Sequence, residues 1–579
     1  MQRSSQSAGV IRLLALSMVV TVVMLPIRAG AQQGATASAN RLPQDVAREV
    51  VALFNATTTL RATSALEVPA GRDVAGDVAV LNGPVIIAGH VTGRLLAINA
   101  DVLLRKGARI DGDLLVVGGE VEGSEGATIG GELRVYHPPL RYTQDGDRLV
   151  AQLDEPSSEE QWWRRFEPGV KPNSNRLEVA TAGPYNRVEG LPVKVGPVLY
   201  RDQGWGHLRL DADAILRTGS SFTSSTADVG YLVRGEVRIG RQFGATFGGQ
   251  LHDVVEGVEE WQLSHAEVGL ASFLFRRDYR DYYGRHGGQV FTALRATEAA
   301  DLTLSYGDER WSSRQTRNPP TLFGNDREWR ANPVLDAARF HIIDARLRID
   351  TRNDLFNPWA GWYVLAEFER GTGSIADGGG PTSPNVRASP SGPTRYQRVF
   401  LDVRRYNRLA PNAALNLRGV LGGWMSGDPL PLERRLSIDG PGTVPGFDFR
   451  AGGSPDVGTC DSGAILPGRP AQCERIALAQ LEYRNDLRLS FTNGREDARR
   501  TRFRADGAWV FFADAGRGWL VNAPGNPLNL GRHDFPPLSS YRTDIGAGLD
   551  FNLIAVYLAK ALSEPREPMN VFVRVRHRF

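Results

Sequence analysis

Apolar and polar side chains alternate through short segments from residue 176 to residue 579. In residues 208–216, leucine and alanine occupy one parity, while Arg209, Asp211 and Asp213 occupy the other. Residues 341–350 repeat this pattern, and turns rich in Gly, Asp, Asn and Pro separate the segments. A period of two predicts strands with one apolar and one polar face. A soluble β-sandwich also alternates in this way, so the number of segments and the end of the chain must decide the class of protein.

The chain ends on the segment VFVRVRHRF, residues 571–579. One of its faces consists of Val571, Val573, Val575, His577 and Phe579. The other face carries Phe572 followed by three arginines. A terminal strand with an apolar outer face and a cationic inner face is typical of outer-membrane barrels. The sequence therefore predicts an all-β protein, a transmembrane antiparallel β-barrel of about sixteen strands in residues 176–579. Val575, His577 and Phe579 also resemble the C-terminal signal by which such barrels are delivered for insertion.

The N-terminal residues 1–31 combine early arginines with an apolar stretch at residues 13–27 and the sequence Ala29-Gly30-Ala31. This order of features predicts a secretory signal peptide. Apolar residues at near-helical spacing in residues 42–60 then predict one amphipathic helix, within a short helix and linker at residues 32–65.

Residues 66–136 contain an internal repeat. Glycine followed by a short β-branched run recurs at Gly76, Gly93, Gly112 and Gly131, at spacings of 17, 19 and 19 residues. Such a period predicts the coils of a β-helix, about four in number, each burying its inward side chains on the next. The segment resembles the bactofilin, or polymer-forming, domain. That resemblance implies self-association or a periplasmic partner through residues 66–136, with a capped spacer as the alternative. A linker is expected at residues 137–175.

The segment RRLSIDGPGTVPGFDFR, residues 434–450, interrupts the alternating region. Its glycines and prolines exclude a helix and do not suit the interior of a sheet. Because its aromatic residues would be poorly placed in water, a loop folded against an inner wall is one interpretation, and an ordinary surface loop is the other.

Several motifs of this barrel region, taken in order, resemble the superfamily of BamA/TamA and two-partner-secretion transporters, the bacterial surface antigen family. Residues 350–362, DTRNDLFNPWAGW, are similar to its D-x-R…N-P-x-x-G strand and turn, and residues 436–450 to its lumenal loop. Residues 481–484, LEYR, and 512–516, FADAG, are similar to two of its wall strands.

The resemblance implies site residues in the loop and in the wall. The loop motif comprises Asp439, Gly440, Val444, Pro445, Gly446, Phe447 and Arg450. The partners in the wall are Glu482, Arg484, Asp514 and Gly516. In the family, a loop arginine is held by wall carboxylates, but Pro445 stands at that position here. Arg450 is the expected substitute for it, and packing of Phe447 and Phe449 alone is the alternative.

The implied activity is insertion or translocation of protein, or of lipid, across the outer membrane, at a weak seam between the first and last strands. Residues 32–175 lack the β-α-α-β-β order of the family's POTRA modules. A structural anchor that presents the bactofilin-like element to the periplasm is therefore the alternative. The expected partners are outer-membrane lipid and a protein client.

Composition narrows these expectations. The chain has 68 basic and 65 acidic residues, and cleavage of the predicted signal peptide would remove three arginines. The remaining chain would carry 65 residues of each sign, and this balance argues against nucleic-acid binding. Cys460 and Cys473, in an exported protein, predict a disulfide. The histidines show no metal-ligand spacing, and no G-x-S-x-G or HExxH motif is present. We therefore expect no enzyme activity, no metal and no cofactor.

Overall fold

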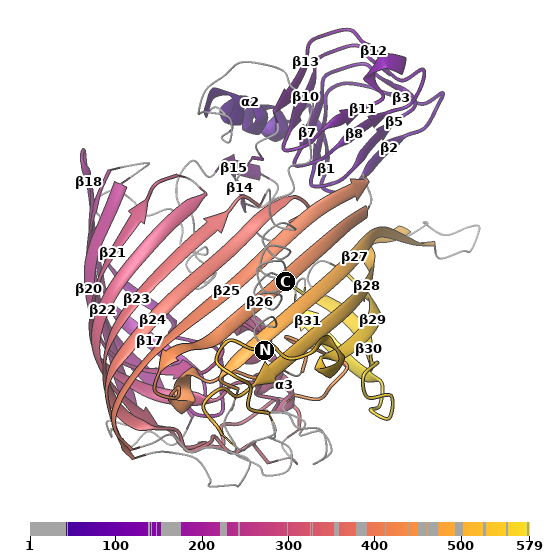
Figure 1. Cartoon of the computed structure of the whole chain (residues 1–579). Helices are drawn as coiled ribbons and strands as arrows, with labels where there is room; N and C mark the ends of the chain where they lie inside the picture. The colour runs from indigo at the N-terminus through magenta and orange to yellow at the C-terminus, as the bar shows by residue number, and fades with distance from the viewer. Residues whose placement is uncertain are drawn as a thin grey trace, which may run out of the picture.

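The computed structural model is an all-β molecule made of an N-terminal β-solenoid and a barrel of sixteen antiparallel strands (Figure 1). It describes residues 42, 44–136, 139–140, 142–145, 148–151, 175–219, 228–240, 244–297, 299–324, 326, 328–352, 358–377, 391–410, 413–438, 440–449, 460, 473–492, 502–524, 528–551, 554–575 and 578–579. The architecture confirms the predicted fold class and the strand number. The predicted signal peptide lies outside the described residues.

The solenoid stacks its coils in parallel, so that each strand pairs with the strand one coil later. Three sheets result, in the orders β1-β4-β7-β10-β13, β11-β8-β5-β2 and β12-β9-β6-β3. The strands are β1 (Leu60–Ala62), β2 (Leu66–Val68), β3 (Asp73–Val74), β4 (Val78–Leu81), β5 (Val85–Ile87), β6 (His90–Val91), β7 (Leu95–Ile98), β8 (Val102–Leu104), β9 (Arg109–Ile110), β10 (Leu114–Val117), β11 (Val121–Glu122), β12 (Thr128–Ile129) and β13 (Leu133–Tyr136). Valine, leucine and isoleucine side chains from all three sheets fill the interior.

The sheet β1-β4-β7-β10-β13 is apolar on both faces, because a helix covers its outer face. Helix α2 (Gln44–Asn55) buries Val50 and Phe54 against side chains such as Leu96 and Ile98. A hairpin of β14 (Tyr142–Asp145) and β15 (Arg148–Ala151) completes this second core with Leu149. The residues predicted as linker thus include a packed hairpin, and the solenoid begins at β1, before residue 66.

Aspartates at the coil corners bind the backbone of the following coil. Asp77, Asp101 and Asp113 accept hydrogen bonds from the backbone N–H groups of Arg94, Glu120 and Glu132, at 2.8, 2.9 and 2.8 Å. Each bond satisfies an amide at a corner where the sheets leave it without a ladder partner.

We expect Asp113→Ala to destabilise the last coil by about 1 kcal/mol, because the Glu132 amide loses its acceptor. Hydrogen exchange read by mass spectrometry would report this as faster exchange in residues 128–136. Asp73→Ala is the matched control, since the Asp73 side chain is 77% exposed and its carboxylate lies 3.4 Å from the His90 ring nitrogen. Equal exchange in the two variants would contradict the role of the corner aspartate.

The barrel strands follow one another in sequence order, each antiparallel to the next. They are β16 (Asn175–Thr181), β17 (Pro192–Gln203), β18 (Gly206–Arg217), β19 (Val229–Ile239), β20 (Gly244–Gly257), β21 (Tyr282–Arg295), β22 (Ala300–Ser313), β23 (Ala337–Asp350), β24 (Gly361–Asp377), β25 (Gly392–Ala410), β26 (Ala413–Gly427), β27 (Arg475–Thr492), β28 (Arg502–Trp519), β29 (Arg542–Asp550), β30 (Ile554–Ala561) and β31 (Asn570–Val575). Helix α3 (His265–Phe275) lies in the connection between β20 and β21.

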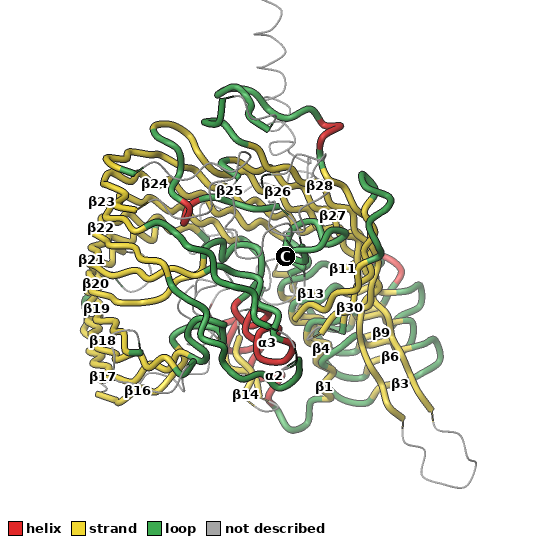
Figure 2. The backbone as a smooth tube through the Cα atoms, turned by 90° about the horizontal axis from the view of Figure 1, so that it is seen from below, coloured by secondary structure: helices red, strands yellow, loops and turns green. Residues whose placement is uncertain are grey.

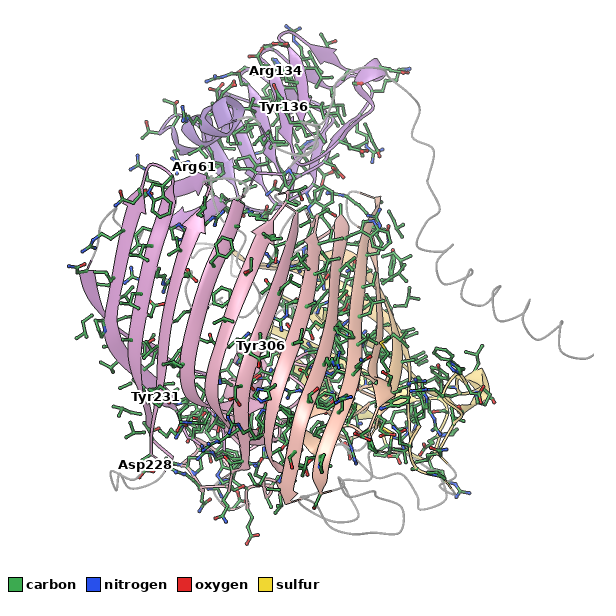
Figure 3. All side chains as sticks on the ribbon, turned by 60° about the vertical axis from the view of Figure 1, so that its left-hand side comes forward. Arg61, Arg134, Tyr136, Asp228, Tyr231 and Tyr306 are labelled. Atoms are coloured by element: carbon green, nitrogen blue, oxygen red, sulfur yellow. A yellow bond between two sulfur atoms is a disulfide. The ribbon has the colours of Figure 1, made fainter. Side chains whose placement is uncertain are left out.

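The barrel strands are apolar outside and charged inside. In β18, Leu208 and Leu210 are 38% and 44% exposed, whereas Asp211 and Asp213 are each 3% exposed. Aromatic residues such as Tyr306, 49% exposed, also stand on the outer wall (Figure 3). This is the reverse of a soluble protein, in which charged groups face water and leucines are buried.

The two ends of the sheet do not meet. Across the residues that the structure describes, no hydrogen-bonded ladder joins β16 to β31. We call this opening between β16 and β31 the seam. Viewed from the end of the barrel opposite the solenoid, α3 lies in this opening, between β16 and β30 (Figure 2). No helix in the described part of the chain is long and apolar enough to span a membrane.

Candidate functional site: the lumenal loop and the seam

The connection between β26 and β27 folds into the barrel lumen. Leu436, Ile438, Val444 and Phe447 are each at most 3% exposed. They pack on wall side chains that include Phe400, Val420, Ile476, Leu478 and Ala561. We call residues 434–449 the lumenal loop; its apolar side chains face the inner wall instead of solvent.

Glycine is required in the lumenal loop and its wall at one left-handed backbone position and three close approaches. Gly440 has a φ of +92°, which L-residues with a side chain rarely adopt. A Cβ at Gly442 would stand 2.5 Å from the backbone oxygen of Gln262, and one at Gly446 would stand 2.8 Å from the backbone nitrogen of Ala561. In the wall, a Cβ at Gly516 would stand 2.6 Å from Ile438, so the loop packs on the bare backbone of β28.

Polar contacts hold the loop mainly through its own backbone. The Gly446 N–H donates to the Asp544 carboxylate, and the Gln480 side chain donates to the Thr443 carbonyl at 2.8 Å. The Asn570 amide donates to the Pro445 carbonyl at 3.2 Å, and Arg574 donates to the Pro441 carbonyl at 3.0 Å. The Arg542 guanidinium lies 4.7 Å from the ring centre of Phe447. The loop is thus fixed without a charged side chain at position 445.

The wall carboxylates expected to receive the loop bind other groups. Asp514 forms an ion pair with Arg578, next to the C-terminal residue, and both side chains are at most 1% exposed. Glu482 accepts hydrogen bonds from Asn416 and Arg484, at 3.2 and 3.4 Å.

Arg484 also pairs with Asp550 at 2.9 Å. Arginines of the wall and of the C-terminus thus pair with Glu482 and Asp514. The expectation that these carboxylates hold the loop through Arg450 stays a prediction. Asp439 and Arg450 lie outside the described residues.

The start of the lumenal loop carries its own charge clamp. The Arg434 guanidinium donates to Glu369 of β24 at 2.8 Å and to the Tyr283 hydroxyl at 3.0 Å. Its centre lies 4.4 Å from the ring of Trp311. Neither oxygen of the neighbouring Glu433 has a hydrogen-bond partner among the described residues. Burial, with the nearby charge of Asp336, raises the pKa of Glu433 well above its ordinary value. The positive charge of Arg434 is thus held by the Glu369 carboxylate and by two aromatic side chains.

A disulfide joins Cys460 to Cys473 at the end of the connection. The Cys473 backbone exchanges hydrogen bonds with Leu436, at 2.9 and 3.0 Å, so it ties the base of the lumenal loop to the start of β27. A Cβ at Gly518 would stand 2.3 Å from the Cys473 sulfur, which shows how closely the disulfide approaches β28.

The C-terminal residues turn toward the lumen. Val571 and Val573 are 64% and 59% exposed on the outer face, but β31 ends at Val575. Val575, Arg578 and Phe579 line the lumenal cavity. Their turn inward differs from the expectation that Phe579 shares the outer face of Val571. His577 lies outside the described part of the chain.

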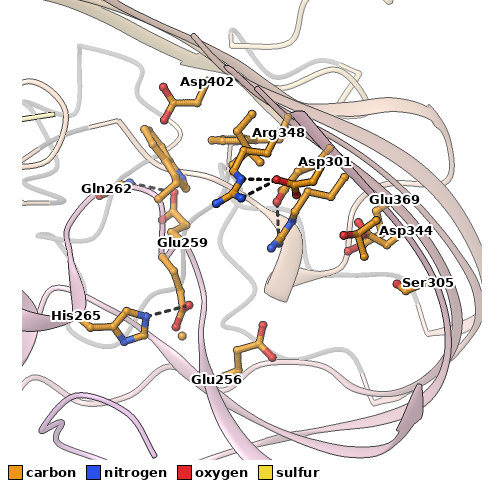
Figure 4. A pocket seen from close by; sticks show the side chains of 18 of the residues that line it. Glu256, Glu259, Gln262, His265, Asp301, Ser305, Asp344, Arg348, Glu369 and Asp402 are labelled. Carbon is orange, nitrogen blue, oxygen red and sulfur yellow. Dashed lines mark hydrogen bonds and ion pairs between the residues drawn. The ribbon is translucent and has the colours of Figure 1, made fainter. Parts of the chain in front are cut away.

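The cavity beside the lumenal loop has a volume of about 840 Å³ and is lined by paired charges. Arg348 and Asp301 pair across neighbouring strands at 2.6 Å (Figure 4). Arg418 binds Asp402 at 2.8 Å. Among the described residues, no group of three or more His, Cys, Asp or Glu side chains is placed to hold a metal ion. The lining is thus largely polar and charged.

Several residues of this site escaped the sequence analysis, namely Glu369, Arg434, Asp544, Arg574 and Arg578. The sequence carried one signal of lumenal ion pairs: an arginine and a carboxylate recur two positions apart along several strands. Such spacing places Arg404 and Asp402, or Arg484 and Glu482, on one lumenal face. Pairs between distant strands, such as Arg434 with Glu369, leave no comparable signal in the sequence.

Comparisons with known proteins give distant likenesses only. No family model matches the sequence, and no curated protein matches it. The fold is similar to that of BamA from Haemophilus ducreyi lacking POTRA domains 1–3, at 14% identity and a TM-score of 0.40, over 70% of each chain. It is also similar to that of CdiB from Acinetobacter baumannii, at 13% identity and a TM-score of 0.28, over 69% of this chain and 58% of CdiB. The chain thus spans less than two thirds of CdiB.

Proposed function

We propose that this chain is an integral outer-membrane barrel that inserts or translocates protein, or lipid, at the seam between its first and last strands. One observation carries the proposal: over the described residues, the sixteen-stranded wall has no ladder between β16 and β31, while the lumenal loop occupies the interior. The motifs that resemble the surface antigen family support the same function.

The outer surface of the wall supports the proposed membrane location. Outward leucines and valines such as Leu177 and Val179 are 71% and 66% exposed, which suits a lipid environment. The solenoid lies at the barrel end where the connections β17–β18 and β19–β20 are short (Figure 1). Short turns mark the periplasmic end of bacterial outer-membrane barrels, so we place the solenoid in the periplasm.

The proposed mechanism of insertion depends on the seam. The edges of β16 and β31 that face the seam carry ladder N–H and C=O groups to which a client strand can add. The docked lumenal loop narrows the axial route, so a client leaves the barrel more readily sideways through the seam than along the lumen.

Reconstituted protein tests the proposed function. Purified full-length protein in liposomes is expected to accelerate the folding of a urea-denatured outer-membrane barrel client, or the flipping of a fluorescent lipid. The controls are empty liposomes and liposomes that hold a closed barrel of similar size. Rates equal to both controls, for client and for lipid, would overturn the proposal.

A second candidate is a structural anchor that presents the solenoid to the periplasm. Its basis is the last coil, whose strands β11, β12 and β13 are edge strands, with Leu133 40% exposed. Deleting residues 66–136 separates the two functions. Lost envelope shape or clustering with preserved client assembly would favour the anchor, and the opposite outcome would favour the assembly function.

A further inference from the structure

Helix α3 is apolar on almost every side and lies in the seam. From Val268 to Phe275 it carries no charged side chain, and Leu270, Phe273 and Phe275 are 43%, 42% and 51% exposed. Its N-terminus is fixed by a capping box in which the Ser264 hydroxyl accepts from the Glu267 amide. A helix that is apolar all round is normally buried in protein or in lipid.

On one side of the seam, α3 is attached to the last strand. Glu267 forms an ion pair with Arg574 of β31, and both side chains are at most 7% exposed. The same carboxylate accepts a hydrogen bond from the Val575 backbone N–H at 3.2 Å. A side chain of the helix thus accepts a hydrogen bond from a backbone N–H group near the end of β31.

On the other side, α3 packs on the connection that follows the first strand. A Cβ at Gly269 would stand 3.3 Å from the Tyr185 nitrogen and 3.4 Å from the Pro184 side chain. The Tyr185 and Phe273 rings meet edge to face, with centres 5.3 Å apart. The helix therefore bridges the two ends of the barrel sheet, which do not pair directly in the described residues.

The two ends of α3 face different surroundings. Ser264, His265 and Glu267 line the lumenal cavity, whereas Leu270 and Phe273 do not, although both are exposed. The two strands that flank the seam also expose apolar side chains, with Leu177 on β16 and Val573 on β31 at 71% and 59% exposed. Leu270 and Phe273 thus lie outside the cavity lining, on a helix that occupies the opening between the two terminal strands.

We propose that α3 completes the barrel wall at the seam and that Leu270 and Phe273 contact the acyl chains of the membrane. This inference rests on the proposed membrane location of the barrel. Lipid fits this face better than water does, because the helix lies in an opening between strands with apolar outer faces and residues 268–275 hold no charge. A client that leaves through the seam must displace α3 and break its contact with Arg574.

Fluorescence quenching by lipid tests the proposal on the full chain. Both native cysteines are in the disulfide, so an introduced cysteine is labelled alone. Bimane-labelled Leu270→Cys and Phe273→Cys, in vesicles of phosphatidylcholine with brominated acyl chains, are expected to lose at least half of their fluorescence. The reference variants are Val573→Cys on the outer face of β31 and Thr303→Cys in the cavity lining, which should be quenched strongly and weakly, respectively.

The outcomes separate this inference from the proposed function. If Val573→Cys is quenched by brominated lipid while Leu270→Cys and Phe273→Cys respond only to aqueous iodide, α3 faces water and the inference is wrong. If brominated lipid does not quench Val573→Cys either, the proposed membrane location is wrong, and the inference that rests on it is wrong as well. Retained heat-modifiable migration on gels shows that each labelled variant is folded. If Leu270→Cys and Phe273→Cys cross-link to a second copy of the chain or to a client and show no quenching by lipid, the inference is also wrong.

Discussion

Arg578→Leu is expected to lower the free energy of unfolding by about 3–5 kcal/mol, because it leaves the Asp514 carboxylate buried without its partner. The Arg578 guanidinium also lies 3.8 Å from the centre of the Phe512 ring, so its loss removes a second contact in the same place. Urea unfolding in detergent micelles, followed by gel migration or tryptophan fluorescence, measures the change.

The matched control is Arg339→Leu, whose ion pair with Asp308 is exposed, at 55% and 40% for the two side chains. Solvent screens such a pair, so we expect a change of about 0–1 kcal/mol. Adding Asp514→Asn to Arg578→Leu should recover part of the lost stability, because the uncompensated charge is removed. Equal unfolding free energies for Arg578→Leu and Arg339→Leu would show that the buried pair does not secure the C-terminus.

Gly446→Val is expected to release the lumenal loop and to raise the single-channel conductance of the barrel several-fold. The added side chain would meet Asp544 and the Ala561 backbone within 3 Å, and the strand backbone cannot yield to it. The hydrogen bond from the Gly446 amide to Asp544 would break with it. Planar-bilayer recordings on the full-length protein measure the effect.

Gly419→Val in β26 is the matched control, since a Cβ there meets nothing within 4 Å. This variant should conduct like the unsubstituted protein. If Gly446→Val also leaves the conductance unchanged while folding normally, the lumenal loop is not what narrows the axial route.

The alternating pattern predicted much of this molecule by itself. Strands with leucine on one parity and charges on the other, as in residues 208–216, must bury one face and expose the other, whatever their neighbours are. A repeat with glycine corners likewise permits few folds other than stacked coils, and the corner aspartates Asp77 and Asp113 bind backbone amides there. Both signals are local, because a period depends only on the spacing along the chain.

Tertiary structure alone decided which charges meet and how the seam is filled. The motif residues Glu482 and Asp514 were identified from the sequence. Their partners, Arg484 and Arg578, were not predicted as such. The curvature of the wall and the inward position of the C-terminal residues decide which guanidinium groups come within reach of these carboxylates. Similarly, nothing in the sequence of residues 265–275 shows that they connect β31 to the segment that follows β16. Sequence fixes the face on which a side chain stands, whereas contacts between segments about 300 residues apart, such as Glu267 with Arg574, depend on how the whole sheet curls.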